Sequence, residues 1–122
     1  MLVVDAANVV GSRPTGWWRD RAGAARELVE GVRAAARHGR LDPPVVVVLE
    51  GRARDGAERG EADGVEIVHA PGEGDDGIVD VVAAAVANDP ITVVTADRGL
   101  AARVSAHGAT VVGPQWLNER VF

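Results

Sequence analysis

The chain contains no cysteine and no lysine, and these two absences remove whole classes of chemistry. Without thiols there is no disulfide, no thiolate metal site and no cysteine nucleophile. Without lysine there is no P-loop lysine and no Schiff base, and a receiver domain, which needs a lysine beside its acidic pocket, is disfavoured. A metal site must therefore use oxygen ligands, with a histidine at most, and such ligands favour Mg²⁺ or Mn²⁺.

Positive charge and long apolar runs are also scarce. The 18 acidic residues outnumber the 13 arginines and give a net charge of −5, whereas most non-specific nucleic-acid binders are basic. A metal-dependent nuclease escapes this objection, because bound cations offset part of an acidic cluster. There is no basic leader before an apolar segment and no apolar run of membrane-spanning length, so we expect a cytoplasmic protein that does not enter a membrane.

The 122 residues predict one domain, 1–122, with a substantial buried core. Strand-like and helix-like segments alternate, which predicts a three-layer α/β/α fold with a central, mainly parallel sheet of about five strands. The predicted strands are 2–5, 45–49, 65–68, 91–95 and 110–112, and the predicted helices are 20–39, 76–88, 98–107 and 114–121. We interpret 6–18 and 51–63 as loops, the second being a mobile insertion within the fold.

Acidic residues gather where the predicted strands end. They are Asp5, Glu50 and Asp97, which follow strands, and the pair Asp75-Asp76, which opens a helix. Because ligands of parallel sheets bind at the carboxyl ends of the strands, we expect these side chains to share one edge. Asp80 should project from the same helix face as Asp76, since the two are four residues apart.

This acidic edge has two interpretations. Crowded carboxylates repel one another, and a divalent cation between them relieves the repulsion and can activate a water for attack on a phosphate. Alternatively, the acids are merely helix caps, as Asp97 would be for 98–107 and Asp76 for its own helix. The convergence of several acids on one edge favours the metal site, built around Asp5, Asp76 and Asp97.

Three short motifs follow one another along the chain. They are Asp5-Ala6-Ala7-Asn8-Val9-Val10-Gly11, Gly74-Asp75-Asp76-Gly77-Ile78-Val79 and Thr95-Ala96-Asp97-Arg98-Gly99-Leu100. They resemble the opening D-x-x-N-V motif, the paired-Asp helix start and the late S/T-x-D motif of NYN domains, which belong to the PIN-like nuclease superfamily. The order and strand context match along essentially the whole chain, and the bacterial YacP-like NYN group is the most similar.

The resemblance implies a PIN-like sheet of strand order 3-2-1-4-5, which places Asp5 beside Asp97. It also implies ribonuclease activity that depends on Mg²⁺ or Mn²⁺. In this view Asp5, Asp76 and Asp97 carry the metal and the catalysis, and Asp75 is a further ligand or a neighbouring acid. Asp80 is an additional candidate ligand, one residue later than the helix Glu of the YacP-like group.

The same resemblance gives Asn8 and Thr95 supporting roles. Asn8 would orient the loop or contact the phosphate, and Thr95 would donate a hydrogen bond near the metal. Trp17 and Trp18 either stack on RNA bases, with arginines on the phosphates, or pack at the start of the 20–39 helix. The predicted substrate-binding residues are Arg13, Trp17, Arg19, Arg52, Thr95 and Arg98.

Three functions stay open at this point. The first is an endoribonuclease that acts on single-stranded RNA, and the second is a nucleotide phosphohydrolase or pyrophosphohydrolase using the same carboxylates. The third is a non-catalytic RNA- or protein-binding module on a nuclease-like fold. A long arginine-lined groove would favour RNA, and a closed pocket would favour a nucleotide. Trp116 and Leu117 either pack the last helix onto the sheet or form a homodimer contact.

Overall fold

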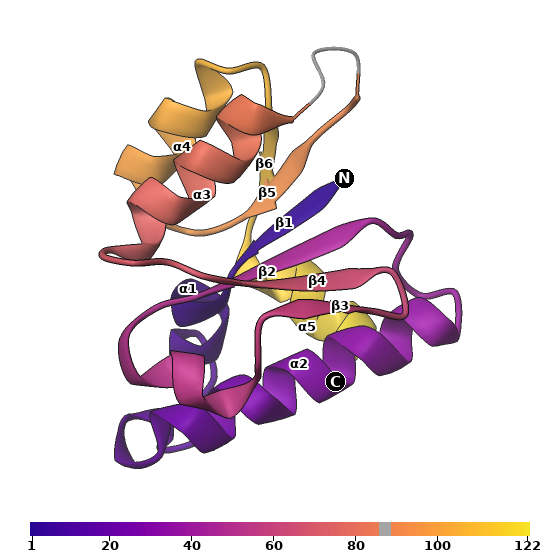
Figure 1. Cartoon of the computed structure of the whole chain (residues 1–122), viewed down its shortest axis with the longest axis vertical. Helices are drawn as coiled ribbons and strands as arrows, with labels where there is room; N and C mark the ends of the chain where they lie inside the picture. Colours follow the sequence, from indigo (N-terminus) through magenta and orange to yellow (C-terminus); the bar gives the residue numbers. More distant parts are fainter. Residues whose placement is uncertain (86–88) are drawn as a thin grey trace.

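The computed structural model describes residues 1–85 and 89–122, in which a twisted sheet lies between two layers of helices (Figure 1). The strands are β1 (Leu2–Asp5), β2 (Val45–Leu49), β3 (Gly60–Ala62), β4 (Val65–His69), β5 (Thr92–Val94) and β6 (Thr110–Val112). The helices are α1 (Ala6–Gly11), α2 (Arg21–Arg37), α3 (Gly74–Ala84), α4 (Arg98–Ser105) and α5 (Pro114–Val121). Short 3₁₀ helices cover Trp17–Arg19 and Gly51–Gly56.

The sheet has the order β3-β4-β2-β1-β5-β6, and every pair except β3–β4 is parallel. The predicted order 3-2-1-4-5 is therefore confirmed as β4-β2-β1-β5-β6. The predicted count of about five strands is one too low, because β3 adds an antiparallel strand at the edge. The α/β class with a mainly parallel sheet is thus confirmed.

The buried strands divide their side chains between two apolar clusters, as period-two alternation requires. Val4, Val47 and Ile67 face α1, α2 and α5, whereas Val3, Val46 and Val93 face α3 and α4. Both faces of the central strands are covered, which explains why β2 is a continuous run of Val and Leu. Leu117 is fully buried against the first face, so α5 packs onto the sheet as predicted.

The interpretation of 6–18 as a loop is wrong, because its first six residues form α1. The Asp5 carboxylate accepts a hydrogen bond from the Asn8 N–H and so caps this helix, while Ala6 and Val9 are buried beneath it. The chain therefore turns directly from β1 into a helix, which fixes Asp5 at the point where the strand ends.

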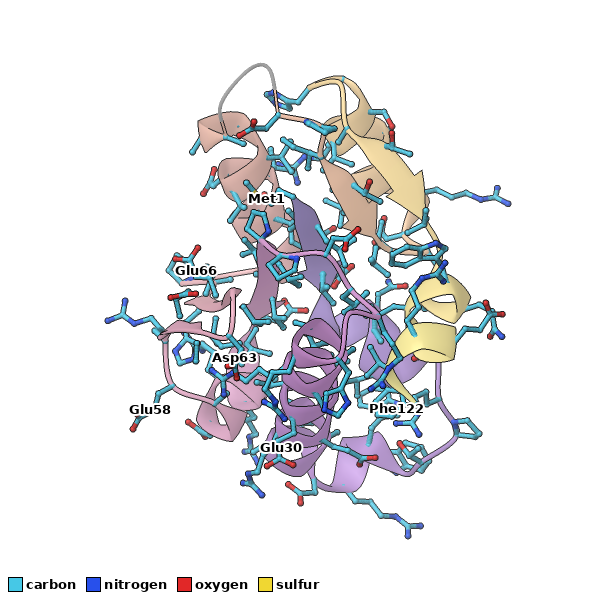
Figure 2. The ribbon with its side chains drawn as sticks, turned by 90° about the vertical axis from the view of Figure 1, so that its right-hand side faces the viewer. Met1, Glu30, Glu58, Asp63, Glu66 and Phe122 are labelled. Carbon is cyan, nitrogen blue, oxygen red and sulfur yellow. The ribbon has the colours of Figure 1, made fainter. Side chains whose placement is uncertain are left out.

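The interpretation of 51–63 as a mobile loop is also wrong in part, since it contains the Gly51–Gly56 3₁₀ helix and β3. Asp63 and Gly64 turn the chain from β3 into β4 with φ angles of 57° and 77°, a turn typical of Asp-Gly hairpins. Arg37 of α2 forms an ion pair with Asp63 at 3.0 Å. Glu61 on β3 and Glu58 just before it (Figure 2) place negative charge at this edge of the sheet, which disfavours pairing with other strands.

The remaining helices match their predicted positions within a few residues. The predicted 76–88 helix begins two residues earlier, at Gly74, and ends at Ala84; residues 86–88 lie outside the described part of the chain. No helix in the described part is both long and apolar enough to cross a membrane.

Candidate active site

The carboxyl ends of β1 and β5 meet, because the two strands are parallel neighbours with Val4 paired to Val94. The next residues, Asp5 and Thr95, are both buried. The Thr95 hydroxyl donates a hydrogen bond of 2.9 Å to Asp5 Oδ2. Two motifs separated by ninety residues of sequence are thus joined at one atom pair, as the predicted strand order requires.

Asp5 is the most deeply buried acid in the described residues, with 4% of its surface exposed. Burial raises the pKa of its carboxyl from 3.8 to about 6, against the hydrogen bonds from Thr95 and the Asn8 N–H, which lower it. The negative charges of Asp75 and Glu50 raise the pKa of Asp5 further. Asp5 is therefore held in a place where its negative charge is costly without a nearby cation.

Asn8 and Thr95 fix the loop that follows β5. The Asn8 side-chain oxygen accepts a hydrogen bond of 2.9 Å from the Ala96 N–H, and the Thr95 hydroxyl oxygen accepts one of 3.1 Å from the Asp97 N–H. α1 and the β5 end are thereby tied together beside Asp5. This geometry agrees with an orienting role for Asn8, whereas its contact with a phosphate stays a prediction.

Asp97 has the capping role that the alternative interpretation gave it. Its Oδ1 accepts a hydrogen bond of 3.0 Å from the Leu100 N–H at the start of α4. Its charge also raises the pKa of Asp75, so the two carboxylates lie close enough to repel. Capping and membership of the acidic edge are therefore compatible for this residue.

Asp75 interacts electrostatically with the acids that follow β2 and β5. It lies in the first turn of α3, half-buried, and burial raises its pKa, followed by the charges of Asp97 and Glu50. Arg103 of α4 lowers the pKa of Asp75 in partial compensation. Asp75 thus senses the charge of acids at the ends of both β2 and β5.

Asp76, predicted to be a central ligand, points elsewhere. Its carboxylate is 68% exposed and forms an ion pair of 3.0 Å with Arg103. Adjacent helical residues project in directions about 100° apart, so when Asp75 faces the sheet edge Asp76 faces α4. Asp80 is exposed one turn further along the Asp76 side. The structure therefore groups Asp75, rather than Asp76 or Asp80, with Asp5 and Asp97.

Glu50 completes this group of acids at the strand ends, where its position after a buried strand predicted it. It directly follows β2, and one carboxylate oxygen accepts a hydrogen bond from the Gly74 N–H at the start of α3. A Cβ at position 74 would lie 2.9 Å from the Glu50 carboxyl carbon, so a larger residue there would make the Glu50 side chain shift. The signal in the sequence was an acid immediately after a buried strand.

In the structure the acidic edge therefore consists of Asp5, Glu50, Asp75 and Asp97, without Asp76. The described residues contain no three histidine, aspartate or glutamate side chains arranged to hold a metal ion. Asp5, Glu50 and Asp97 each accept a backbone hydrogen bond. Mg²⁺, however, keeps several waters and uses one or two carboxylates together with substrate phosphates. The oxygen donors and their mutual repulsion fit such a water-rich ion, and they do not form a preformed cage.

Comparisons with known proteins give the fold a counterpart. No protein-family model matches the sequence, and no curated protein matches it. Two crystal structures of Rae1 (YacP) from Bacillus subtilis are similar to this chain. One, a single-residue variant, has a TM-score of 0.73 and 21% identity, over 98% of this chain and 73% of that one. The other has a TM-score of 0.71 and 20% identity, over 99% and 72%.

At this level of identity the likeness shows the fold. It is the fold that the three motifs predicted through their resemblance to the YacP-like group. The likeness extends over nearly the whole of this chain, so the acidic edge lies within the part of the structure that Rae1 shares.

The arginines predicted to bind the substrate have different surroundings. Arg13 forms an ion pair of 3.5 Å with Glu27 and lies 3.6 Å above the ring of Phe122 at the carboxyl terminus. Its contact with a substrate stays a prediction. Arg19 lies 5.8 Å from the Trp18 ring, and Arg52 and Arg98 are exposed; their contact with RNA stays a prediction.

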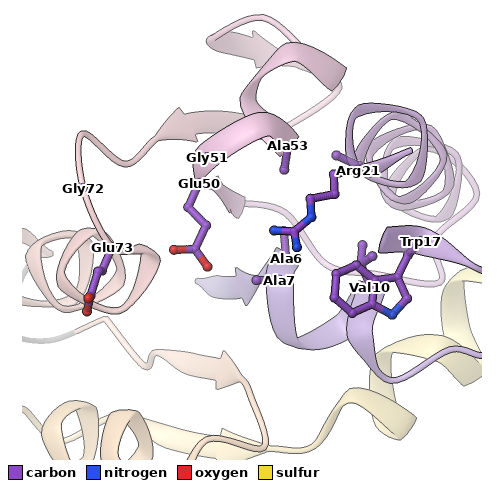
Figure 3. Close-up of a pocket in the computed structure, with 11 residues that line it drawn as sticks. Ala6, Ala7, Val10, Trp17, Arg21, Glu50, Gly51, Ala53, Gly72 and Glu73 are labelled. Atoms are coloured by element: carbon purple, nitrogen blue, oxygen red, sulfur yellow. The ribbon is translucent and has the colours of Figure 1, made fainter. Parts of the chain in front are cut away.

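A pocket of about 420 Å³ adjoins the acidic edge (Figure 3). Its walls come from α1, the start of α2, the Trp17–Arg19 turn and the Gly51–Gly56 turn, and Glu50 lies at its border with the acidic edge. Small apolar side chains line it: Ala6, Ala7, Val10, Ala25 and Ala53. Trp17 lines this pocket, whereas Trp18 is 57% exposed and meets Trp17 edge to face at 6.0 Å.

Proposed function

We propose that this chain is a metal-dependent phosphodiester hydrolase that cleaves single-stranded RNA. The observation that supports the proposal is the acidic edge, where side chains from the ends of β1, β2 and β5 and from the start of α3 act on one another's charge. The three motifs and the fold shared with Rae1 (YacP) add to it. Carboxylates that raise one another's pKa values are expected at a site that binds a cation.

The residues of the acidic edge would hold Mg²⁺ or Mn²⁺ chiefly through Asp5 and Asp75. When bound, the ion would orient a water and offset charge on the phosphate and on the leaving oxygen. Thr95 holds Asp5 in one orientation, and Asn8 and Thr95 together fix the loop that presents Asp97. The chain thus positions its acids through hydrogen bonds that exist before any ligand arrives.

The pocket also supports a second candidate, a nucleotide hydrolase. A pocket of this volume lies within the range that holds small molecules, and Arg13 is engaged by Glu27 and Phe122. The same acids would then act on the phosphates of a mononucleotide. The two candidates share the chemistry and differ in the size of the substrate.

The test is incubation of the protein with labelled single-stranded RNA and with the four nucleoside triphosphates, each with Mg²⁺, with Mn²⁺ or with EDTA. We expect RNA fragments with either ion, none with EDTA, and unchanged triphosphates. Hydrolysis of triphosphates alone would establish the second candidate instead. If neither substrate reacts with either ion, both hydrolase proposals are wrong.

A further inference from the structure

Among the residues that the structure describes, an indole ring and an arginine line the pocket beside the acidic edge. The indole belongs to Trp17, and the Arg21 guanidinium lies 5.4 Å from its ring centroid. Within the described part of the chain, no carboxylate forms an ion pair with Arg21. An unpaired arginine beside an indole is suited to a planar ligand that stacks and accepts hydrogen bonds.

The opposite side of the pocket presents an acceptor. Glu50 uses one carboxylate oxygen for the Gly74 N–H, which leaves the other for a ligand. Figure 3 shows the Glu50 carboxylate and the Arg21 guanidinium pointing into the same space from opposite sides. A ligand between them needs hydrogen-bond donors on one edge and acceptors on another.

We propose that this pocket binds a guanine base of the substrate, an inference that rests on the proposed function. Guanine carries two adjacent donors, N1–H and N2–H, for the free oxygen of the Glu50 carboxylate. Its O6 and N7 accept the paired donors of an arginine, which is a common specific contact to this base. Trp17 supplies a stacking surface, and the small alanines leave room for a purine ring.

The other bases fit this pair of side chains less well. Adenine and cytosine each place a ring acceptor next to their amino group, and that acceptor would face the Glu50 carboxylate. Uracil has a single N–H between two carbonyl oxygens, with the same consequence. The repulsion between the Glu50 carboxylate and a ring acceptor weakens binding of these three bases. It therefore adds to the preference that the guanine contacts provide.

Glu50 belongs to both the pocket and the acidic edge. A guanine held against Glu50 therefore lies next to the acidic edge. The pocket would then choose which phosphodiester bond reaches the acids, so the cleavage products of single-stranded RNA should share guanine at one fixed position next to the cut.

Binding of GMP, AMP, CMP and UMP, measured by calorimetry in EDTA, tests the pocket without catalysis. We expect GMP to bind roughly tenfold more tightly than the other three, the discrimination typical of one bidentate contact. Arg21→Gln should remove this preference. Arg26→Gln, which removes the same charge from an exposed position of α2 outside the pocket, should keep it.

Equal binding of all four nucleotides, no binding of GMP, or a preference that survives Arg21→Gln would overturn the inference. Mapping of cleavage sites in RNA of mixed sequence separates it from the proposed function. RNA cut without regard to guanine would refute the guanine pocket and leave the hydrolase intact. GMP preference without any cleavage would support the pocket and refute the hydrolase.

Discussion

Asp75→Asn is expected to lower RNA cleavage at least about 100-fold, whereas Asp76→Asn is expected to stay within about twofold of wild type. The two acids are neighbours at the start of α3 and the substitutions are equal in size and charge. The difference in activity is expected because the two side chains point in different directions. Asp75 lies on the acidic edge, whereas Asp76 forms an ion pair with Arg103. Single-turnover cleavage at saturating Mg²⁺ measures it.

Stability provides the control for this pair. Asp76→Asn removes an exposed ion pair, a change of less than about 1 kcal/mol, and Asp75→Asn relieves repulsion from Asp97 and Glu50. Neither variant should unfold, so circular dichroism and thermal melts should resemble those of wild type. An equal loss of activity in both variants, or a larger loss in Asp76→Asn, would contradict the assignment of Asp75.

Asp5→Asn is expected to abolish cleavage and at the same time to stabilise the metal-free protein at neutral pH. The pKa of Asp5 is raised from 3.8 to about 6, so its charge costs about 3 kcal/mol of folding free energy above that range. Asparagine keeps the acceptor for the Asn8 N–H but changes the contact with Thr95. The net gain in unfolding free energy should therefore be about 1–2 kcal/mol.

The pKa of Asp5 also determines how the stability of the protein changes with pH. A raised pKa means that the folded state binds the proton more tightly, so the contribution of Asp5 is greatest below about pH 4 and is lost as the pH rises to about 6. The stability gained from Asp5→Asn should accordingly appear between these values and persist above them. Urea unfolding in EDTA at a series of pH values measures it, and a variant less stable than wild type at pH 7.5 would contradict the burial argument.

The sequence predicted the central sheet well because burial leaves a strong pattern. The runs Leu2–Asp5 and Val45–Leu49 are apolar on both faces, so the parallel strands and their order followed from the pattern and the motif resemblance. β3 was missed because its three residues are all exposed. Its signal was the Asp63-Gly64 turn, since an Asp-Gly pair before a strand predicts a hairpin.

The candidate site was predicted in its location but not in every residue. Spacing placed both Asp75 and Asp76 at the right helix end, yet the rotation of α3 decides which of them faces the edge, and that rotation follows the burial of Ile78 and Val82 against the sheet. Arg13 lay near the edge in sequence, but contact with Phe122 from the far end of the chain turns it away. The pocket beside Glu50 joins five separate stretches of the chain and leaves no local sequence pattern.

The acidic composition of the chain is compatible with RNA binding if cations bind at the acidic edge. Part of the net charge of −5 resides in the acidic edge, where bound cations would reduce it. RNA affinity would then depend on the ion as well as on exposed arginines such as Arg52 and Arg98. A protein of this kind is expected to bind RNA weakly in EDTA.

The most direct test of the acidic edge is Mn²⁺ binding measured by electron paramagnetic resonance of the free ion. Wild type and Asp76→Asn should bind Mn²⁺ with equal affinity, and Asp5→Asn and Asp75→Asn should each bind at least about tenfold more weakly. Mg²⁺ should displace the bound Mn²⁺. Failure of wild type to bind Mn²⁺, or equal binding by all four proteins, would contradict the claim that Asp5 and Asp75 hold a catalytic cation.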